Sequence, residues 1–418
     1  ARVGCMPSKV LISSANRMHD IQHANEIGLN LNGEVDTTQV MHRVRRLRDQ
    51  FTQATLDDVE KWPVQHKISG TAKFINANTI EVNGQHYQSK SFIVAVGSTP
   101  TYDQAWKDEL GDLLITSDQI FELPYLPKSL AVIGSGVIAL ELAQAMQRLG
   151  VQVTMFARSR KVGSLTSPQL QQIAQKTLSK EIKILFETLP EKINQLNGQV
   201  EIKYSQQGTQ QTLITDYMLV ATGRESQLKQ LDLEKIDQTF SDLKKLPINT
   251  NTKQLGSYPI FVVGDAHSST PIQHEAAHEG KMTVQNCLNF PDVKPIKTLT
   301  ALGIVFSQPE MASVAKTHKQ LSAENIDFVT GFVSYEGQGR AQVLAKNQGA
   351  VEIYISKKDG KILGAELFCP AAEHLAHLLA WLIDADATLA DALNKPFYHP
   401  TLEEGLRTAL KHARRQLS

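Results

Sequence analysis

LAVIGSGVIALE, residues 130–141, is the stretch of sequence that decides the fold. Its apolar start predicts a buried strand, its two glycines a tight turn, and the amphipathic spacing over residues 137–149 a helix. A second apolar run over residues 151–156 completes a predicted βαβ unit. Residues 134–139 match the pattern G-x-G-x-x-A in the strand–turn–helix context that dinucleotide binding requires. A pyrophosphate at the helix N-terminus is therefore the favoured reading, and a plain tight turn is the alternative.

Three other apolar runs also end in glycine-containing turns. They are residues 91–96 before Gly97, residues 217–221 before Thr222-Gly223, and residues 260–263 before Gly264-Asp265. Short strands alternate with helices through the first two thirds of the chain, which favours an α/β class. In such sheets ligands bind beyond the carboxyl ends of the strands, so these turns are candidate binding sites.

The last third of the chain has a different pattern. Residues 350–356 and 361–368 alternate around Lys358-Asp359-Gly360, which predicts a β-hairpin. Helices are predicted over residues 371–383 and 388–393, and a final helix from residue 402. This part predicts a separate α+β domain.

Composition excludes several classes of protein. Lys+Arg and Asp+Glu are balanced at 43 each among 418 residues, and no basic stripe favours nucleic acid. We find neither a signal peptide nor an apolar run that could span a membrane, so we expect a cytoplasmic protein. The three cysteines lie far apart in sequence, which is unlike the disulfide framework of a secreted domain.

The residues after the second strand of the βαβ unit bear on the choice of dinucleotide. An acidic residue there would bind the ribose hydroxyls of NAD, but the sequence has Ala157-Arg158-Ser159-Arg160. Arg158 and Arg160 suit a 2′-phosphate, which favours NADP(H) over NAD(H). The alternative is that both arginines are solvated surface charges.

Gly4-Cys5-Met6-Pro7-Ser8-Lys9 places a cysteine at a predicted helix start. The helix N-terminus and the nearby Lys9 would both favour a thiolate at Cys5. A buried, inert cysteine is the alternative.

Six motifs in one order make this chain similar to the flavin-dependent pyridine nucleotide–disulfide oxidoreductases. The family includes dihydrolipoamide dehydrogenase, which is the nearest member, and glutathione reductase. The motifs are C-M-P-S-K at 5–9, A-V-G-S at 95–98 with Val96 in place of threonine, the fingerprint with Glu141, A-T-G-R at 221–224, G-D at 264–265, and H-P-T-L-E-E at 399–404.

The resemblance implies a role for each catalytic position. Cys5 would be the thiol next to the flavin, and Lys9, paired with Glu141, would lie beside the flavin ring. His399 would come from the partner subunit of a homodimer and act as acid and base for the thiols, which suits an imidazole near neutral pH. Glu404 would orient His399, although Thr401-x-x-Glu404 is also a capping-box pattern.

The resemblance also implies FAD as cofactor, together with a nicotinamide dinucleotide. The positions expected to contact a cofactor are Lys9, Ala72, Val96, Gly97, Ser98, Gly134, Ser135, Gly136, Val137, Ile138, Ala139, Glu141, Arg158, Arg160, Gly223, Asp265, Gln273 and His274; no metal ligand is expected. The expected substrate is a small disulfide or a lipoyl-type group.

Four domain segments are expected. They are an FAD-binding domain over residues 1–120 and 225–295, an NAD(P)-binding domain over 121–224, and a dimerisation domain over 296–418. The family's first redox cysteine would lie five residues before Cys5, upstream of residue 1, preceded by the first FAD-binding βαβ unit. We therefore expect the numbered chain to be a fragment of a family member.

Three alternatives remain open. His274-Glu275-Ala276-Ala277-His278 matches the zinc-hydrolase pattern H-E-x-x-H. A dimer without catalysis is a second alternative. Within the family, a glutathione reductase-like or other NADPH-dependent reductase is the third, because dihydrolipoamide dehydrogenase usually uses NAD. Two observations favour dihydrolipoamide dehydrogenase over this third alternative. Val137 stands where glutathione reductases carry a tyrosine, and residues 411–418 contain none of the extra thiols of mercuric or thioredoxin reductases.

Overall fold

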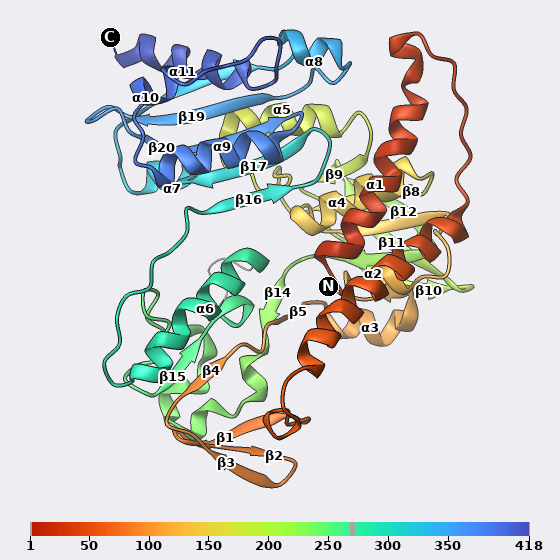
Figure 1. Ribbon diagram of the computed structural model, residues 1–418. Coiled ribbons are helices and arrows are strands. Elements are labelled where there is room, and N and C mark those ends of the chain that lie inside the picture. Colours follow the sequence, from red (N-terminus) through yellow and green to blue (C-terminus); the bar gives the residue numbers. More distant parts are fainter. Residues whose placement is uncertain (1, 268–271, 418) are drawn as a thin grey trace. The chain divides into compact units, whose positions relative to one another are not determined.

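The computed structural model describes residues 2–267 and 272–417 (Figure 1). The chain divides into two compact units, each formed from separate stretches of sequence. Unit 1 comprises residues 1–55, 102–222 and 300–418, and unit 2 comprises residues 56–101 and 223–299. No helix among the described residues is long and apolar enough to cross a membrane.

A parallel five-stranded sheet forms the first layer of unit 1. Its order is β6-β13-β7-β8-β9. The strands are β6 (Leu114–Ile115), β7 (Ser129–Ile133), β8 (Gln152–Ala157), β9 (Lys183–Phe186) and β13 (Tyr217–Val220). The predicted βαβ unit is confirmed as β7-α4-β8, with α4 over Val137–Arg148.

Helices and a small antiparallel sheet accompany this layer. The helices are α3 (Gln104–Leu110) and α5 (Pro168–Leu178), and the sheet consists of β10 (Lys192–Leu196), β11 (Gln199–Gln206) and β12 (Thr209–Thr215). Two further helices come from the start of the chain, α1 (Cys5–Gln22) and α2 (Thr37–Glu60). α1 packs directly on α4, and both helices contribute to the largest apolar core of unit 1.

The C-terminal part of unit 1 is the predicted α+β domain. Its antiparallel sheet has the order β16-β17-β20-β19-β18. The strands are β16 (Leu302–Val305), β17 (Glu310–Ala315), β18 (Phe328–Ser334), β19 (Ala350–Ser356) and β20 (Ile362–Cys369). Its helices are α7 (His318–Ala323), α8 (Gly339–Val343), α9 (Ala372–Asp384), α10 (Leu389–Leu393) and α11 (Glu404–Leu417). The predicted hairpin is confirmed as β19-β20.

The two faces of this sheet pack on different partners. α9 and α11 cover one face, and the alternating residues Val351, Ile353 and Ile355 of β19 point into that core. α5 packs against β19 and β20, on the face that carries Glu352. Both faces are therefore buried, and the polar residues of β19 and β20 cannot all face water.

Unit 2 is built from short strands. β1 (Ala72–Asn76), β2 (Thr79–Val82) and β3 (Gln85–Gln88) form an antiparallel sheet, β4 (Phe92–Val94) pairs in parallel with β15 (Ile260–Val262), and β5 (Ser98–Pro100) pairs with β14 (Arg224–Ser226). α6 (Gln273–Asn289) completes the unit. The strands predicted over 91–96 and 260–263 are present but shorter, because Gly97 and Gly264 turn the chain with φ of 72° and 61°.

A pair of acidic residues lies buried between α5 and the C-terminal sheet. Glu352 and Glu366 are opposite each other on β19 and β20, with exposures of 2% and 0%. The hydroxyl of Tyr354 is 2.8 Å from one carboxylate and 3.0 Å from the other. Burial raises the pKa of Glu352, the nearby Glu366 charge raises it further, and hydrogen bonds from Ser167 and Tyr354 lower it in part.

Glu352 should make stability depend on pH. A raised pKa means that the folded chain holds this proton more tightly than the unfolded chain, so the stabilisation is complete below the ordinary value of 4.5 and is lost as pH rises through the folded value. E352Q cannot ionise. We expect it to flatten the fall in the free energy of unfolding as the pH rises above the ordinary value of 4.5, measured by urea denaturation.

The charged and titratable groups around Glu352 are Glu366, Tyr354 and His318. They stay unchanged in this variant. E324Q, at a glutamate paired on the surface with Lys316, is the control and should keep the wild-type slope. An E352Q slope equal to that of the wild type would show that Glu352 is already ionised in the folded protein.

Candidate redox and dinucleotide site

Cys5 is the first residue of α1, as predicted. Gly4 precedes it with φ 84°, and no side chain caps the helix N-terminus. The Cys5 side chain is exposed. Cys5 therefore lies at a helix start with free N–H groups, a position that suits a reactive thiol.

Lys9 lies one turn further along α1 and is held by two groups. Its Nζ is 2.6 Å from Oε2 of Glu141 on α4 and 4.4 Å from the centre of the Phe306 ring. The backbone N–H of Phe306 donates to the other carboxylate oxygen of Glu141 at 2.8 Å. The Glu141 side chain is 6% exposed, so this pair is shielded from solvent on the glutamate side.

His399 and Glu404 form a second pair, at the start of α11. His399 Nδ1 is 3.1 Å from each carboxylate oxygen of Glu404, while the His399 side chain is 81% exposed. The hydrogen bond from His399 lowers the pKa of Glu404, and the Thr401 N–H contributes further. The Thr401 hydroxyl bonds to the Tyr398 carbonyl, so only half of the capping-box pattern forms.

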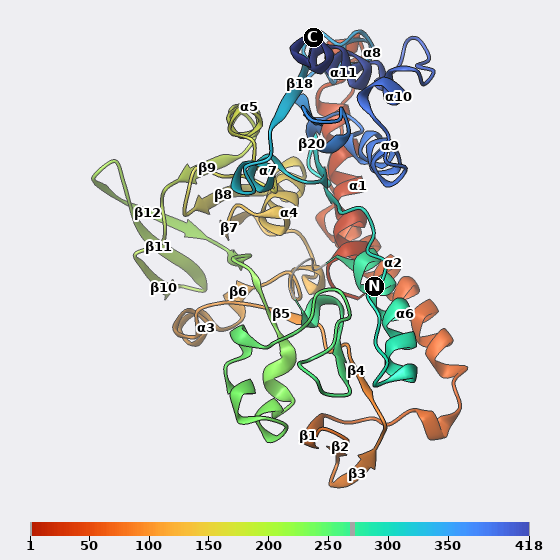
Figure 2. The ribbon, with the colours of Figure 1, turned by 90° about the vertical axis from the view of Figure 1, so that its left-hand side faces the viewer.

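The two pairs are not brought together within one chain. Cys5 and Lys9 lie at the start of α1, whereas His399 directly precedes α11. Both views place α11 at the end of unit 1 opposite the start of α1 (Figures 1 and 2). An exposed imidazole without a thiol beside it is the arrangement expected if a second subunit completes the site.

The glycine turn between β7 and α4 has the geometry of a dinucleotide site. Gly134 has φ 123°, and a Cβ atom there would come within 2.5 Å of the Ala221 carbonyl oxygen. Only glycine therefore allows the two strand ends to lie this close. Gly136 caps α4 without a side-chain hydrogen bond, which leaves the first N–H groups of α4 for a ligand. These residues fit a dinucleotide pyrophosphate.

The loop after β8 carries the two arginines. It is tied to the glycine turn, because Ser135 Oγ donates to the Lys161 carbonyl at 2.7 Å. Arg158 is exposed beyond the end of β8. Arg160 lies 3.6 Å from Glu187 and 5.8 Å from the centre of the Phe186 ring, so the two guanidinium groups have different surroundings.

Unit 2 groups the side chains of two expected cofactor positions, Ser98 and Asp265, with that of Arg224. Ser98 Oγ donates to Asp265 Oδ2 at 3.1 Å, and Arg224 Nε donates to Ser98 Oγ at 2.9 Å. The turns at Gly97 and Gly223 have positive φ, which places these side chains at the ends of neighbouring strands. This charged cluster suits the hydroxyl groups of a flavin ribityl chain.

Three other expected cofactor positions also belong to unit 2. Ala72 is the first residue of β1, and Gln273 and His274 form the first turn of α6. α6 has no side-chain hydrogen bond at its N-cap, Ile272, so this helix start is also suited to a phosphate group.

Sequence reasoning missed a buried ion pair behind the Gly264–Asp265 turn. Lys253 Nζ is 2.5 Å from Glu279 Oε1, and the other oxygen of Glu279 accepts the Gly264 N–H at 2.9 Å. The Lys253 side chain is 5% exposed. Lysine in a polar stretch predicts a surface residue, so the sequence contained no local signal for this contact.

The zinc-hydrolase pattern does not form a metal site in the described residues. His278 Nε2 is 2.6 Å from the Lys297 carbonyl, and His274 lies near Glu275 at 3.8 Å. Among residues 2–267 and 272–417, no three His, Cys, Asp or Glu side chains converge in a way that could hold a metal ion.

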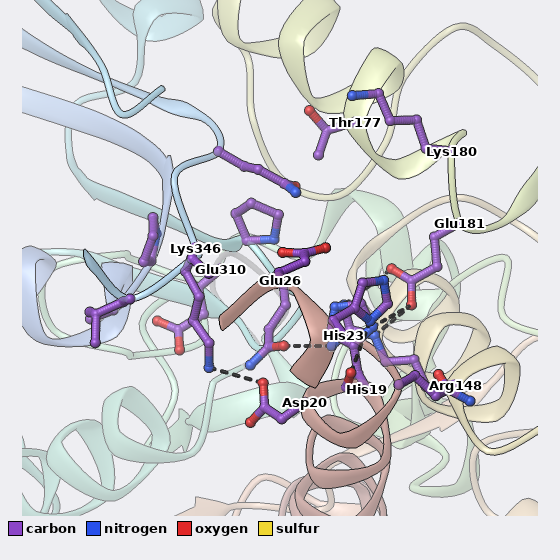
Figure 3. A pocket seen from close by; sticks show the side chains of 18 of the residues that line it. His19, Asp20, His23, Glu26, Arg148, Thr177, Lys180, Glu181, Glu310 and Lys346 are labelled. Atoms are coloured by element: carbon purple, nitrogen blue, oxygen red, sulfur yellow. Dashed lines mark hydrogen bonds and ion pairs between the residues drawn. The ribbon is translucent and has the colours of Figure 1, made fainter. Parts of the chain in front are cut away.

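A cavity of about 1010 Å³ lies at the other end of α1 (Figure 3). Its lining includes His19, His23, Arg148, Glu181 and Lys346. Burial and the Arg148 charge lower the pKa of His19 to about 4, so its imidazole is neutral near pH 7. None of the predicted site residues lines this cavity.

Two family models together match nearly all of the chain. The pyridine nucleotide-disulphide oxidoreductase model matches residues 1–286, and the dimerisation-domain model of the same family matches residues 302–410. The chain belongs to the pyridine nucleotide-disulphide oxidoreductase family. Membership supports FAD and a pyridine nucleotide as cofactors, and the dimerisation domain supports a homodimer.

Curated relatives share moderate sequence identity. A dihydrolipoyl dehydrogenase of Geobacillus stearothermophilus is 30% identical over 409 residues, which cover 96% of this chain and 86% of the relative. A mercuric reductase of Staphylococcus aureus is 28% identical over 411 residues, covering 97% and 74%.

Solved structures share the fold. LpdA from Mycobacterium tuberculosis superposes with a TM-score of 0.81 at 19% identity, covering 100% of this chain and 91% of that chain. The HOCl-induced flavoprotein disulfide reductase RclA from Escherichia coli has a TM-score of 0.77 at 18% identity, covering 98% and 90%. The predicted α/β class with an α+β dimerisation domain is confirmed.

The Lys9–Glu141 pair should contribute measurably to stability. A double-mutant cycle with K9M and E141Q should give a coupling energy of about 1–2 kcal/mol, less than for a fully buried pair because Lys9 is 32% exposed. Urea denaturation measures it. The exposed pair Lys61–Asp58 is the control and should couple by only about 0.3 kcal/mol. Equal coupling in the two pairs would contradict the role of burial.

Proposed function

We propose that this protein is an FAD-dependent NAD(P)H–disulfide oxidoreductase that resembles dihydrolipoamide dehydrogenase and takes a small disulfide or lipoyl-type substrate. The observation that carries the proposal is Cys5 at the start of α1, one turn from Lys9 and its partner Glu141. A thiol alone would not indicate redox chemistry. Family membership and the dinucleotide turn on the same α4 helix support this reading.

The proposed domains follow the expected boundaries. An FAD-binding domain covers residues 1–120 and 225–295, an NAD(P)-binding domain covers 121–224, and a dimerisation domain covers 296–418. The compact units divide the chain differently, because unit 1 joins residues 102–222 with residues 300–418. The dimerisation-domain match over residues 302–410 supports the last boundary.

The residues of the chain perform the thiol chemistry. Cys5, at the helix start and one turn from Lys9, is the proposed flavin-proximal thiol of the redox-active disulfide. His399 of the partner subunit accepts and returns the thiol proton, and Glu404 holds its ring through Nδ1 so that Nε2 faces the substrate. Flavin, when bound, supplies the two-electron relay between nicotinamide and disulfide.

Lys9 places a positive charge on the side of α1 that also carries Cys5. Glu141 and the Phe306 ring fix that charge in one position, because an anion and a π-face both attract an ammonium group. Asp265 and Ser98 of unit 2 are the proposed ligands of the ribityl chain.

The preferred dinucleotide is proposed to be NADP(H). Ala157 ends β8 without the carboxylate that would bind the ribose hydroxyls of NAD, and Arg158 is exposed directly after it. Arg160 shares its charge with Glu187, so Arg158 is the main proposed ligand of the 2′-phosphate.

Removing the imidazole should separate the two half-reactions. We expect H399N to lower kcat for lipoamide or another small disulfide by about 10²–10⁴-fold, because proton transfer to the leaving thiol is lost. Reduction of the flavin by NAD(P)H in stopped-flow should stay at the wild-type rate. C5S should abolish disulfide turnover.

H377N, at an exposed histidine of α9 outside the proposed machinery, is the matched control and should behave as the wild type. Wild-type turnover by H399N would overturn the proposed role of His399.

Changing Arg158 should test the dinucleotide preference. We expect R158A to lower kcat/KM for NADPH by about 10- to 100-fold, through loss of a charge-assisted hydrogen bond, with kcat/KM for NADH nearly unchanged. R340A, at an arginine of α8, controls for loss of positive charge. A wild-type preference for NADH would contradict the proposal.

A further inference from the structure

The arginines of the proposed dinucleotide site lie on a loop that is held from two sides. This specificity loop, residues 158–167, joins β8 to α5. The glycine turn between β7 and α4 holds the first half of the loop. The Ser135 carbonyl accepts the Gly163 N–H at 2.8 Å, and the Ser135 hydroxyl donates to the Lys161 carbonyl. Gln171 of α5 bonds to the Val162 and Leu165 carbonyls, each at 2.8 Å.

The second half of the specificity loop is held by a residue of the C-terminal sheet. Glu366 accepts hydrogen bonds from the backbone N–H and, at 2.9 Å, from the hydroxyl of Thr166. The same carboxylate accepts the His318 N–H at 3.0 Å and the Tyr354 hydroxyl at 2.8 Å. Glu366 is 0% exposed, so its carboxylate is shielded from solvent.

Four donors converge on the one buried carboxylate of Glu366. Tyr354 has a single proton to share between Glu366 and Glu352, and burial and the two carboxylates raise its pKa well above the ordinary value. Glu352 completes the contact by bonding to Ser167, the N-cap of α5. The end of the loop is therefore fixed to β19 and β20 by a buried polar network.

Close packing reinforces these bonds. Gly163 has φ 62°, and a Cβ atom there would overlap the sulfur of Met311 on β17. Gly163 of the loop therefore packs closely against the Met311 side chain of the C-terminal sheet.

We propose that Glu366 is a positioning residue for cofactor selectivity: through Thr166 it fixes the loop from which Arg158 reaches the 2′-position of the bound dinucleotide. The inference rests on the proposed function, since it deepens the dinucleotide site named there. A guanidinium group recognises a phosphate through two parallel hydrogen bonds, so its backbone must be placed within a fraction of an ångström. Glu366 touches no substrate and acts only through the loop.

The experiment measures binding rather than turnover. Holoenzyme is titrated calorimetrically with adenosine 2′,5′-bisphosphate and with 5′-AMP, which differ only by the 2′-phosphate. The ratio of the two dissociation constants reports selectivity. In E366Q the side chain loses its charge and gains N–H groups that face the existing donors, so we expect the ratio to move toward one by about tenfold.

A second pair of variants keeps the test valid if E366Q does not fold. T166V removes the hydroxyl that bonds to Glu366, and T166S keeps it. We expect T166V to move the ratio toward one by about threefold and T166S to restore the wild-type ratio.

E310Q is the matched control, because Glu310 is a half-buried carboxylate of the same sheet that accepts a hydrogen bond from the Glu373 N–H at the start of α9. Its ratio should equal that of the wild type.

A purely structural role for Glu366 would lower stability without changing the ratio. An unchanged ratio in E366Q and T166V, beside a wild type that discriminates between the two nucleotides, overturns the inference alone. A wild type that binds 5′-AMP more tightly overturns the NADP(H) proposal alone, and E366Q should then still move the ratio toward one. A wild-type ratio of one overturns both.

Discussion

The ion pair between Lys9 and the buried Glu141 is the interaction on which the arrangement of unit 1 depends. It joins α1, which begins with the thiol, to α4, which begins with the dinucleotide turn. The same face of α4 carries Gln144 and Arg148, three and seven residues further on. Gln144 bonds to the backbone of Gln308, and Arg148 bonds to Asn16 of α1 and to Glu181. One helix face therefore sets the position of α1 and of the segment that leads into β17.

The charged pairs of this molecule fall into two groups that differ in their exposure to solvent. Lys253–Glu279 and the Glu366 network are buried, and Lys9, which is 32% exposed, pairs with the buried Glu141; each contact links separate segments of the chain. Such groups are costly to leave unpaired, which makes them effective as rigid links between elements. His399–Glu404 is the opposite case, because its imidazole is exposed and free to meet another molecule. The shielded groups link elements of the fold, whereas the exposed imidazole can contact another molecule.

Local patterns predicted much of this structure. Strand ends were predictable because glycine at positive φ is required where the chain turns, as at Gly97, Gly134 and Gly264. The burial of side chains by elements distant in sequence was not predictable from these patterns. The alternation of β19 predicts an outward face for Glu352, but α5 covers that face. Lys9 likewise lies over the ring of Phe306, which is distant in the sequence, and no residue near Phe306 indicates this contact. The motif at residues 399–404 gave the right pair of side chains but only half of the expected cap.

The separation of Cys5 from His399 along the chain has a consequence for biosynthesis. A ribosome makes the thiol end first, and the segment with the imidazole emerges among the last residues. For most of its synthesis the nascent chain thus contains the Cys5 thiol before His399, its proposed acid/base partner, has been made. Until the C-terminal sheet has folded and a partner has been found, that sulfur is open to stray oxidation, so prompt folding protects the chain as well as completing it.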